Sequence, residues 1–425
     1  MRAFSQALYN FSQPEAPAPA AFTYPTWKQA LRELVSLAQN QRLAVLVDDF
    51  HVLLKANPSL ASEIQIVWDH HLSRANLLLC LVGSDRLLIL REVLSYRAPL
   101  YGRATVRIDI RPFYCGQTHA FFLAQSAINR VAIYALIGGL PASWNRLAHL
   151  QTVPEMIAGE FLDPGSPALA DLDTLLKDFR TRPGKLDAVL GALASGAQTN
   201  DEIFQIAGLS NSRKYLRALI DTGFVERKFS LTHARSTREK YYQLTDPALR
   251  CYFRFLARHE TQIVSGRQEQ VLAKIMDELP DFIGQFTWKE LCREWLVRAG
   301  ATGWLPVFPG EVGCAWDNQV EVDVAGIDVL GKIIFLGECS WNTRPVDQGV
   351  MAELVTTKAP RLIPANGHWR VIYLGFARGG WTSQALAYRQ ALEMSGMKST
   401  VNLRPEAIGA PSGCIYSIWT RSTRD

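Results

Sequence analysis

The sequence predicts a multidomain protein of the α/β class, and three observations carry this prediction. Its 425 residues suffice for about three domains at roughly 100–200 residues each. Near the amino end, apolar runs alternate with segments of helical pattern and no hairpin signal lies between them, which is typical of parallel strands joined by helices. Past residue 300, two more apolar runs flank a turn, which predicts a second sheet.

Composition excludes several classes of protein. The sequence is 48% hydrophobic and 20% charged, as in ordinary globular proteins. Its longest apolar runs, such as Leu77–Val82, are far too short to cross a bilayer, and the first residues lack the pattern of a secretory signal. The seven cysteines are scattered without a Cys-x-x-Cys pair, which indicates reduced thiols. We therefore expect a cytoplasmic protein without membrane contact.

The first part of the chain has the pattern of a parallel sheet. Helices are expected over residues 27–39 and 59–72. The apolar runs Leu43–Val47 and Leu77–Val82 predict strands buried on both faces. Val106–Ile110 is a candidate for a further strand.

Polar residues follow both of these strands. Asp48 and Asp49 come directly after the first strand, and Ser84 follows the second. Ligands of parallel sheets bind beyond the carboxyl ends of the strands. One acid there can hold Mg²⁺, and a second can polarise water for attack on a phosphate. Taken alone, these residues fit a nucleotide site or an ordinary α/β fold.

The middle of the chain is expected to be helical and then to form a winged helix. Residues 117–177 have a helical pattern that is broken at Gly138–Pro141. A compact series of three helices and two strands follows. We place these elements at 185–193, from the capping box of Thr199 and Glu202, at 210–220, and at 224–230 and 240–244.

This segment is also the basic part of the chain. Residues 180–258 contain 14 Lys/Arg and 7 Asp/Glu, a net charge of 14 − 7 = +7, against +5 for all 425 residues. A basic helix beside a basic loop suits duplex DNA, where phosphate contacts supply affinity. The residues expected to contact DNA are Arg213, Lys214 and Arg217 on the helix and Arg235, Arg238 and Lys240 in the loop. The alternative is a protein-interaction module with a solvated basic face.

The last third carries a second group of carboxylates. Residues 320–324 alternate, so Glu321 and Asp323 should share one face of a strand, and 333–337 should return antiparallel to Glu338. A helix over 288–297 carries Glu290 and Glu294 one turn apart.

These residues resemble the PD-(D/E)xK nuclease core, in which Asp, Glu and often a helix Glu hold Mg²⁺ while a Lys assists the attacking water. By this resemblance Asp323 and Glu338 are metal ligands and Glu294 is the helix acid. The Lys expected two residues after Glu338 is Ser340, so we expect little or no DNA cleavage. Lys358 on the next helix is the alternative source of an ammonium group. The other interpretation is a fold that binds DNA or protein without cutting.

Seven short motifs, in order, resemble the prokaryotic AAA-type P-loop ATPase family common in archaea, over nearly the whole chain. They are Tyr24-Pro25-Thr26-Trp27, Leu46-Val47-Asp48-Asp49-Phe50, Val82-Gly83-Ser84, Pro99-Leu100-Tyr101-Gly102-Arg103, Gly138-Gly139-Leu140-Pro141, Leu244-Thr245-Asp246-Pro247-Ala248-Leu249-Arg250 and Gly337-Glu338-Cys339-Ser340-Trp341.

The resemblance implies ATP and Mg²⁺ as cofactors. Asp48 would be the Walker B magnesium ligand, and Asp49 would stand where the family often has a catalytic Glu. Ser84 would be the sensor, and Arg103 would sense or neutralise the γ-phosphate.

One part of the family pattern is missing. The family opens with a Gly-x-x-x-x-Gly-Lys-Ser/Thr loop, and the 425 residues contain none; the nearest match, Gly326–Ile333, ends in Ile between two apolar strands. We expect a truncated P-loop sheet that binds ATP weakly or not at all. An internal start and a natural variant both fit this. The strand 77–82 should then have an open edge, closed by Val106–Ile110, covered by a second subunit, or left in a poorly ordered domain.

The predicted domains are a remnant P-loop ATPase core (1–115), a helical lid (116–180), a winged helix (181–258) and a PD-(D/E)xK-like α/β domain (259–425). The predicted function is that of a DNA-associated AAA-type ATPase family protein. A metal-dependent nuclease and a non-enzymatic DNA- or protein-binding scaffold are the alternatives.

Overall fold

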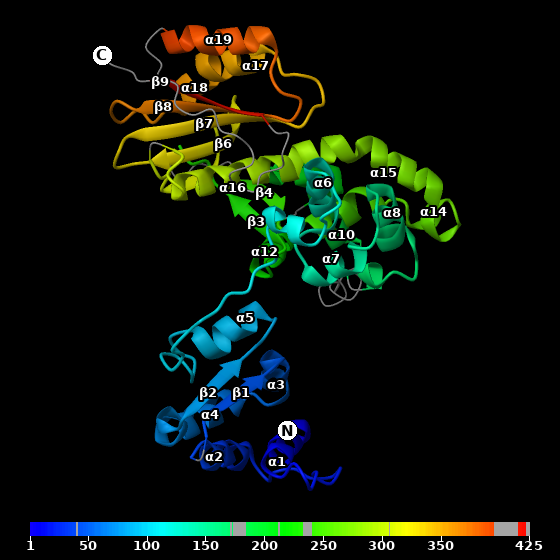
Figure 1. Cartoon of the computed structure of the whole chain (residues 1–425), viewed down its shortest axis with the longest axis vertical. Helices are drawn as coiled ribbons and strands as arrows, with labels where there is room; N and C mark the ends of the chain where they lie inside the picture. Colours follow the sequence, from blue (N-terminus) through cyan, green and yellow to red (C-terminus); the bar gives the residue numbers. More distant parts are fainter. Residues whose placement is uncertain are drawn as a thin grey trace. The chain divides into compact units, whose positions relative to one another are not determined.

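The computed structural model describes residues 1–39, 41–170, 172, 184–210, 213–232, 240–305, 307–394 and 415–421. The chain forms two compact units, Met1–Ile110 and Arg111–Asp425. Both units combine helices with strands (Figure 1), which confirms the predicted multidomain α/β class. No helix in the described ranges is long and apolar enough to cross a membrane.

The first unit is a parallel strand pair with helices. Its elements are α1 (Arg2–Ser12), α2 (Trp27–Ala38), β1 (Leu43–Val47), α3 (Phe50–Ala56), α4 (Leu60–His70), β2 (Leu77–Leu81) and α5 (Arg86–Ile89). The two strands pair in parallel from Leu43–Leu77 to Val47–Leu81, as predicted. Thr26 begins α2 because its hydroxyl accepts a hydrogen bond from the Gln29 N–H at 3.1 Å.

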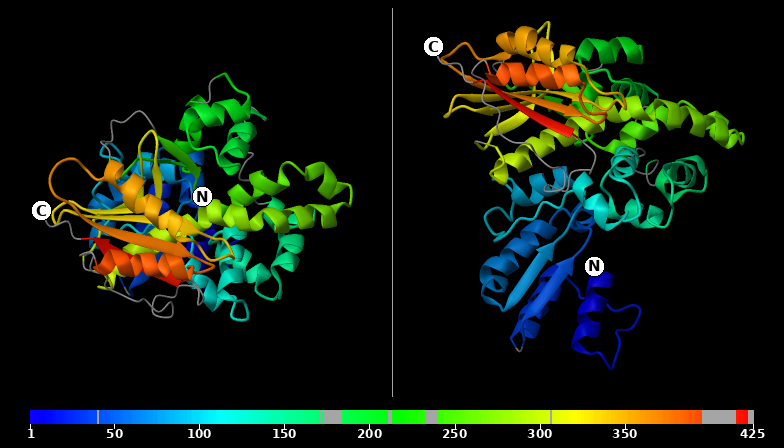
Figure 2. Two further views of the ribbon diagram at one scale, coloured as in Figure 1. Left: turned by 90° about the horizontal axis from the view of Figure 1, so that it is seen from above. Right: turned by 45° about the horizontal axis from the view of Figure 1, so that its top comes forward.

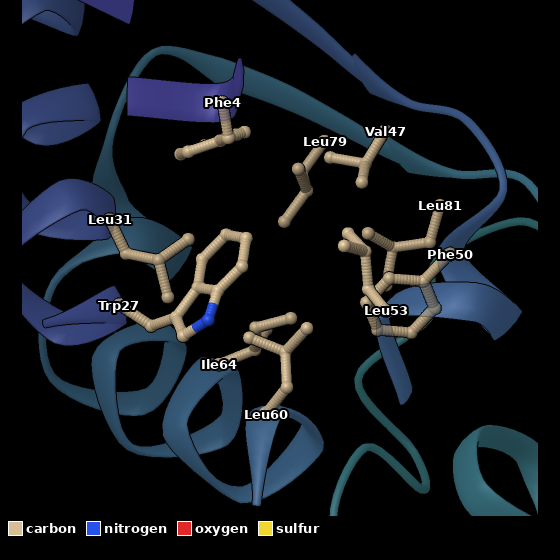
Figure 3. Close-up of a pocket in the computed structure, with 10 residues that line it drawn as sticks. All are labelled: Phe4, Trp27, Leu31, Val47, Phe50, Leu53, Leu60, Ile64, Leu79 and Leu81. Carbon is tan, nitrogen blue, oxygen red and sulfur yellow. The ribbon is translucent and has the colours of Figure 1, made fainter. Parts of the chain in front are cut away.

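The expected burial of these strands on both faces is wrong. On the covered face, Val47 and Leu81 line a small hollow with Trp27 (Figure 3). On the other face, Leu46 is 69% exposed and Leu78 is 50% exposed. An apolar run predicts a strand, but burial also needs helices, and the helices that line the hollow all lie on one side of the pair.

The expected strand at Val106–Ile110 is also absent. No strand is assigned to this segment in the described structure, and β2 pairs there only with β1. Residues 1–25 form α1 and irregular chain, so they place no strand beside β2. The predicted closure of Val106–Ile110 onto β2 is therefore wrong, because alternation gives a segment an apolar side without supplying a backbone partner.

The second unit begins with a helical segment, as predicted. It contains η3 (Cys115–Ala120), α6 (Ala127–Ile137), α7 (Pro141–Leu147), α8 (Val153–Ile157) and η4 (Ala158–Leu162). Trp144 is buried at its centre, and its indole N–H donates to the carbonyl of Gly138 at 2.7 Å, across the expected break. The end of the predicted segment, at 173–177, lies outside the described residues.

Three helices and an antiparallel hairpin follow. They are α10 (Lys185–Ala194), α11 (Asn200–Ala207), α12 (Arg213–Asp221), β3 (Val225–Lys228) and β4 (Tyr241–Leu244). The capping box is present: the Glu202 N–H donates to the Thr199 hydroxyl at 3.3 Å, and the Thr199 N–H donates to the Glu202 carboxylate at 3.0 Å. The core of the three helices and the hairpin includes Val189, Ile203 and Leu216.

The rest of the unit is a five-stranded sheet between helices. The elements are α13 (Pro247–Cys251), η5 (Tyr252–Leu256), α14 (Glu260–Val264), α15 (Gln268–Phe282), η6 (Ile283–Thr287), α16 (Trp288–Ala301), β5 (Glu311–Trp316), β6 (Glu321–Asp328), β7 (Ile333–Ser340), α17 (Gln348–Glu353), η7 (Leu354–Lys358), α18 (Ala359–Leu362), β8 (Arg370–Ala377), α19 (Ser383–Met394) and β9 (Ile415–Arg421). The strand order is β5-β6-β7-β8-β9, and only β7 and β8 are parallel. Helix α16 covers one face and α17–α19 cover the other (Figures 1 and 2).

Candidate functional site

The carboxyl ends of β1 and β2 bring the first group of predicted residues together. The Val82 N–H donates to the Val47 carbonyl at 2.9 Å, and the Phe50 N–H donates to the Val82 carbonyl at 2.8 Å. Asp48 and Asp49 therefore lie at the same edge as the loop that carries Ser84. Asp49 has a left-handed backbone (φ 48°), and its N–H donates to the Asp48 carboxylate at 2.8 Å. Both aspartates and Ser84 are exposed.

Arg103 is not part of this group. Its guanidinium donates twice to Asp69, from Nε at 2.8 Å and from the terminal nitrogen at 2.7 Å. This hydrogen bond lowers the pKa of the Asp69 carboxyl. Asp69 lies in the last turn of α4, where the chain turns toward the amino end of β2. Arg103 is thus held at the opposite end of the strands from Asp48 and Ser84.

The basic face of α12 is the second predicted group. Arg213, Lys214 and Arg217 are exposed, whereas Leu216 and Leu219 of the same helix are buried. Arg217 also forms an i,i+4 ion pair with Asp221 at 2.9 Å, and the Lys214 ammonium lies 4.9 Å from the Tyr215 ring centre. Lys240 is half-buried before β4, and Arg235 and Arg238 lie outside the described residues.

The hairpin is fixed to the edge of the five-stranded sheet. The Ser230 hydroxyl donates to the Trp316 carbonyl at 2.9 Å and accepts from the Trp316 N–H at 3.0 Å. The Leu231 N–H donates to the Cys314 carbonyl at 3.1 Å. The Tyr241 ring stacks on Trp316 with centroids 4.1 Å apart and planes 3° apart. The segment after β3 therefore lies along β5, the edge strand of this sheet.

A buried charged centre lies where β6 and β7 run side by side. The pairing of Val324 with Gly337 puts Asp323 opposite Glu338. Asp323 accepts from the Lys289 ammonium at 2.5 Å through one oxygen, and from the Cys339 N–H at 3.0 Å through the other. Glu338 accepts from the Lys358 ammonium at 2.8 Å. Each carboxylate thus has its own lysine.

An irregularity in β6 shapes this centre. Between two paired positions, β5 advances from Gly313 to Ala315 while β6 runs from Ala325 back to Val322, so β6 contains one extra residue. Val322 and Val324 consequently pack in different cores, and the strict alternation expected for this strand is wrong. The extra residue falls beside Asp323, and bulges of this kind re-aim side chains.

Burial sets the charge states of the centre. Burial, together with the negative charge of Asp323, raises the pKa of Glu338 to about 7, although Lys358 opposes the shift. Burial likewise raises the pKa of Glu321. Burial lowers the pKa of Lys289, but the charge of Asp323 and its hydrogen bond outweigh this, and the net direction is upward.

Helix α16 contributes a residue other than the one predicted. Glu294 pairs with Arg298 of the next turn at 2.5 Å, and the structure pairs the Asp323 carboxylate with Lys289. Arg293, four residues after Lys289, donates to the Asp323 carbonyl at 2.8 Å. Lys289 and Arg293 share one helix face, and this i,i+4 spacing of basic residues is the signal that sequence reasoning missed.

Two carboxylates of the centre are the groups that could hold a cation. Within the described ranges, no three His, Cys, Asp or Glu side chains gather closely enough to hold a metal ion. Asp323 and Glu338 carry carboxylate oxygens, the donor type that Mg²⁺ prefers, and each is paired with an ammonium group.

Comparisons with known proteins give four similarities. Residues 252–351 match a family of archaeal and bacterial proteins of unknown function. An uncharacterized protein of Methanocaldococcus jannaschii is 26% identical over 305 residues, which cover 70% of this chain and 67% of that protein. Among solved structures, the Walker-type ATPase of Pyrococcus abyssi has a TM-score of 0.43 at 16% identity, covering 58% of this chain and 74% of that one. The ORC2 protein of Aeropyrum pernix has a TM-score of 0.25 at 16% identity, covering 64% and 78%.

Proposed function

We propose that this chain is a DNA-associated protein of the prokaryotic AAA-type ATPase family, with residues 181–258 as a winged helix that contacts duplex DNA. The observation that carries the proposal is the division of α12. Its apolar side, with Leu216 and Leu219, is buried, while Arg213, Lys214 and Arg217 face solvent. In a winged helix, the third helix enters the major groove and the wing meets the backbone.

The attachment of the hairpin to β5 supports this assignment. A wing that contacts DNA must hold its position relative to the recognition helix. Ser230, two residues after β3, and Tyr241 of β4 both contact Trp316. We propose that the basic residues between these strands, Arg235 and Arg238, and the adjoining Lys240 then meet phosphates beside the groove that α12 enters.

The experiment is fluorescence anisotropy of a labelled duplex over a series of salt concentrations. Replacing Arg213, Lys214 and Arg217 together with Ala should weaken binding and flatten the slope of log K against log salt by about 0.9 for each phosphate that the variant no longer neutralises. Unchanged affinity and slope in this triple variant would reject α12 as the DNA surface.

A matched control keeps the change in charge but moves it elsewhere. Arg267, Lys274 and Arg344 are exposed and lie outside the three-helix segment. Their combined replacement by Ala lowers the net charge by the same three units. The proposal expects a clearly smaller decrease in affinity, and equal decreases would indicate binding through net charge alone.

We further propose that Asp48 binds Mg²⁺ and that Asp49 and Ser84 contact the nucleotide phosphates. The four proposed domains are residues 1–115, 116–180, 181–258 and 259–425. The hydrogen bonds between the carboxyl ends of β1 and β2, which place Asp48 at the same edge of the strand pair as the loop with Ser84, support the assignment of these residues. We do not assign Arg103 to the γ-phosphate, because its guanidinium is paired with Asp69 at the opposite end of the strands. ATP binding by these 425 residues is proposed to be weak.

The second candidate function is that of a metal-dependent nuclease, and one observation favours it. Lys358 reaches Glu338, so an ammonium group lies beside the paired carboxylates although Ser340 replaces the expected Lys. In this proposal, Asp323 and Glu338 would hold Mg²⁺, which would activate water and polarise the phosphate. Lys358 and Lys289 would orient the scissile phosphate and balance its charge.

A further inference from the structure

The extended segment Val106–Ile110 of the first unit exposes one apolar side. Val106, Ile108 and Ile110 are 72%, 79% and 87% exposed, and the described structure shows no hydrogen bond for their backbones. Arg107 and Asp109 alternate with them and are also exposed. Three exposed β-branched residues in a row at strand spacing are unusual on a protein surface, and unpaired extended backbone is a template for strand addition.

We propose that two copies of this chain associate by pairing this segment antiparallel to itself, centred on Ile108. In that register Ile108 faces Ile108 of the second copy, and Val106 faces Ile110. Arg107 then lies opposite Asp109 of the second copy, and Asp109 lies opposite Arg107. The two-fold axis makes both ion pairs equivalent, as in an isologous interface. This inference is independent of the proposed function.

The charges select both the partner and the register. Sliding the two copies by two residues in one direction puts Arg107 opposite Arg107, and sliding them in the other puts Asp109 opposite Asp109. Like charges directly opposite each other destabilise a strand pair. A one-residue slip turns the apolar side chains to the wrong face. The segment is therefore complementary to itself in one antiparallel register.

Backbone bonds and the apolar stripe supply the affinity. Asp109 also has a contact within its own chain, so its ion pair chiefly fixes the register. A two-stranded ribbon is only marginally stable in water. The dimer is therefore weak, and its population rises with protein concentration.

Sedimentation velocity of the full chain over a concentration series tests the proposal. We expect reversible dimerisation, weakened about tenfold by Arg107→Asp or by Asp109→Arg, because each single change creates two like-charge pairs. The double exchange Arg107→Asp/Asp109→Arg restores opposite charges and should recover the wild-type dissociation constant within about twofold. A chain that is monomeric throughout, or a double exchange that does not recover, would overturn the inference.

Crosslinking tests the register and the contact surface. Ile108→Cys should form a disulfide-linked dimer on mild oxidation, whereas the exposed Ala104→Cys should not, because its two copies lie at opposite ends of the ribbon. Leu46→Ser/Leu78→Ser alters the open face of β1 and β2 and should leave the dimer intact. A dimer that dissociates in that variant, or that crosslinks equally at position 104, would assign the association to another surface. Circular dichroism of each variant confirms that it is folded.

Discussion

The Lys358 ammonium lies 2.8 Å from a carboxylate oxygen of Glu338, twenty residues earlier in the chain. The positive group beside the carboxylates therefore comes from a helix and not from position 340 of the strand. This geometry favours the second candidate function, whereas Ser340 at the usual lysine position predicts little or no cleavage. The nuclease candidate predicts that the chain nicks plasmid DNA with Mg²⁺ or Mn²⁺. It also predicts that Lys358→Ala slows nicking about 100-fold or more, since preorganised charge has effects of ~10²–10³.

Two variants test whether nicking depends on the carboxylates of this centre. Asp323→Asn removes one proposed metal ligand and should abolish nicking. Glu294→Gln alters the helix acid that pairs with Arg298 and should keep nicking near the wild-type rate. No nicking by the wild type with either metal, or full nicking by Lys358→Ala, would count against a nuclease.

The charge state of Glu338 gives a second prediction. Burial and the nearby Asp323 raise its pKa to about 7, so this carboxyl should titrate near neutral pH while exposed glutamates titrate near their ordinary value of about 4.3. Carbon-detected NMR of the side-chain carboxyls, with Glu338→Gln for assignment, measures the midpoint.

Asp323→Asn tests the cause of this shift. Removing a negative neighbour favours the ionised form of Glu338, so the pKa should fall, and it should stay above the ordinary value because burial remains the larger cause. A midpoint for Glu338 near that of exposed glutamates in the wild type would show that the centre is open to water.

Local patterns predicted several elements of the fold. The capping box at Thr199, the parallel pair β1 and β2, and the return of β7 against β6 all followed from residue spacing. Each depends on contacts between residues that are close in the chain or on a periodic apolar side, and the sequence displays such features directly.

Features set by distant contacts were not predictable in this way. The role of Lys289 depends on how α16 lies over a bulge in β6. The attachment of Ser230 to Trp316 joins residues 86 positions apart. The exposure of Leu46 depends on which helices are available to cover the sheet. Periodicity identifies a side chain's face but not the surface that this face meets.

The Ser230–Trp316 contact leads to a prediction about stability. The Ser230 hydroxyl is buried and satisfies both the N–H and the carbonyl of Trp316. Ser230→Ala leaves these two groups without that partner and should lower the free energy of unfolding by about 1–3 kcal/mol. Urea denaturation measures the change. Ser265→Ala, at an exposed hydroxyl, serves as the matched control and should change stability by less than about 0.5 kcal/mol.

The edge formed by Asp48 and Ser84 gives the final prediction, on nucleotide affinity. Phosphates are bound by a row of backbone N–H donors and a lysine in a glycine-rich loop, and no such loop occurs among the 425 residues. The N–H of Asp49 is already used by the Asp48 side chain, and the described hollow beneath the strands is lined by apolar side chains (Figure 3). Equilibrium dialysis of these 425 residues with ATP and Mg²⁺ should therefore show affinity weaker than millimolar, unchanged in Asp48→Ala. Micromolar affinity that Asp48→Ala abolishes would mean that Asp48 and its neighbours bind the nucleotide by another arrangement of donors.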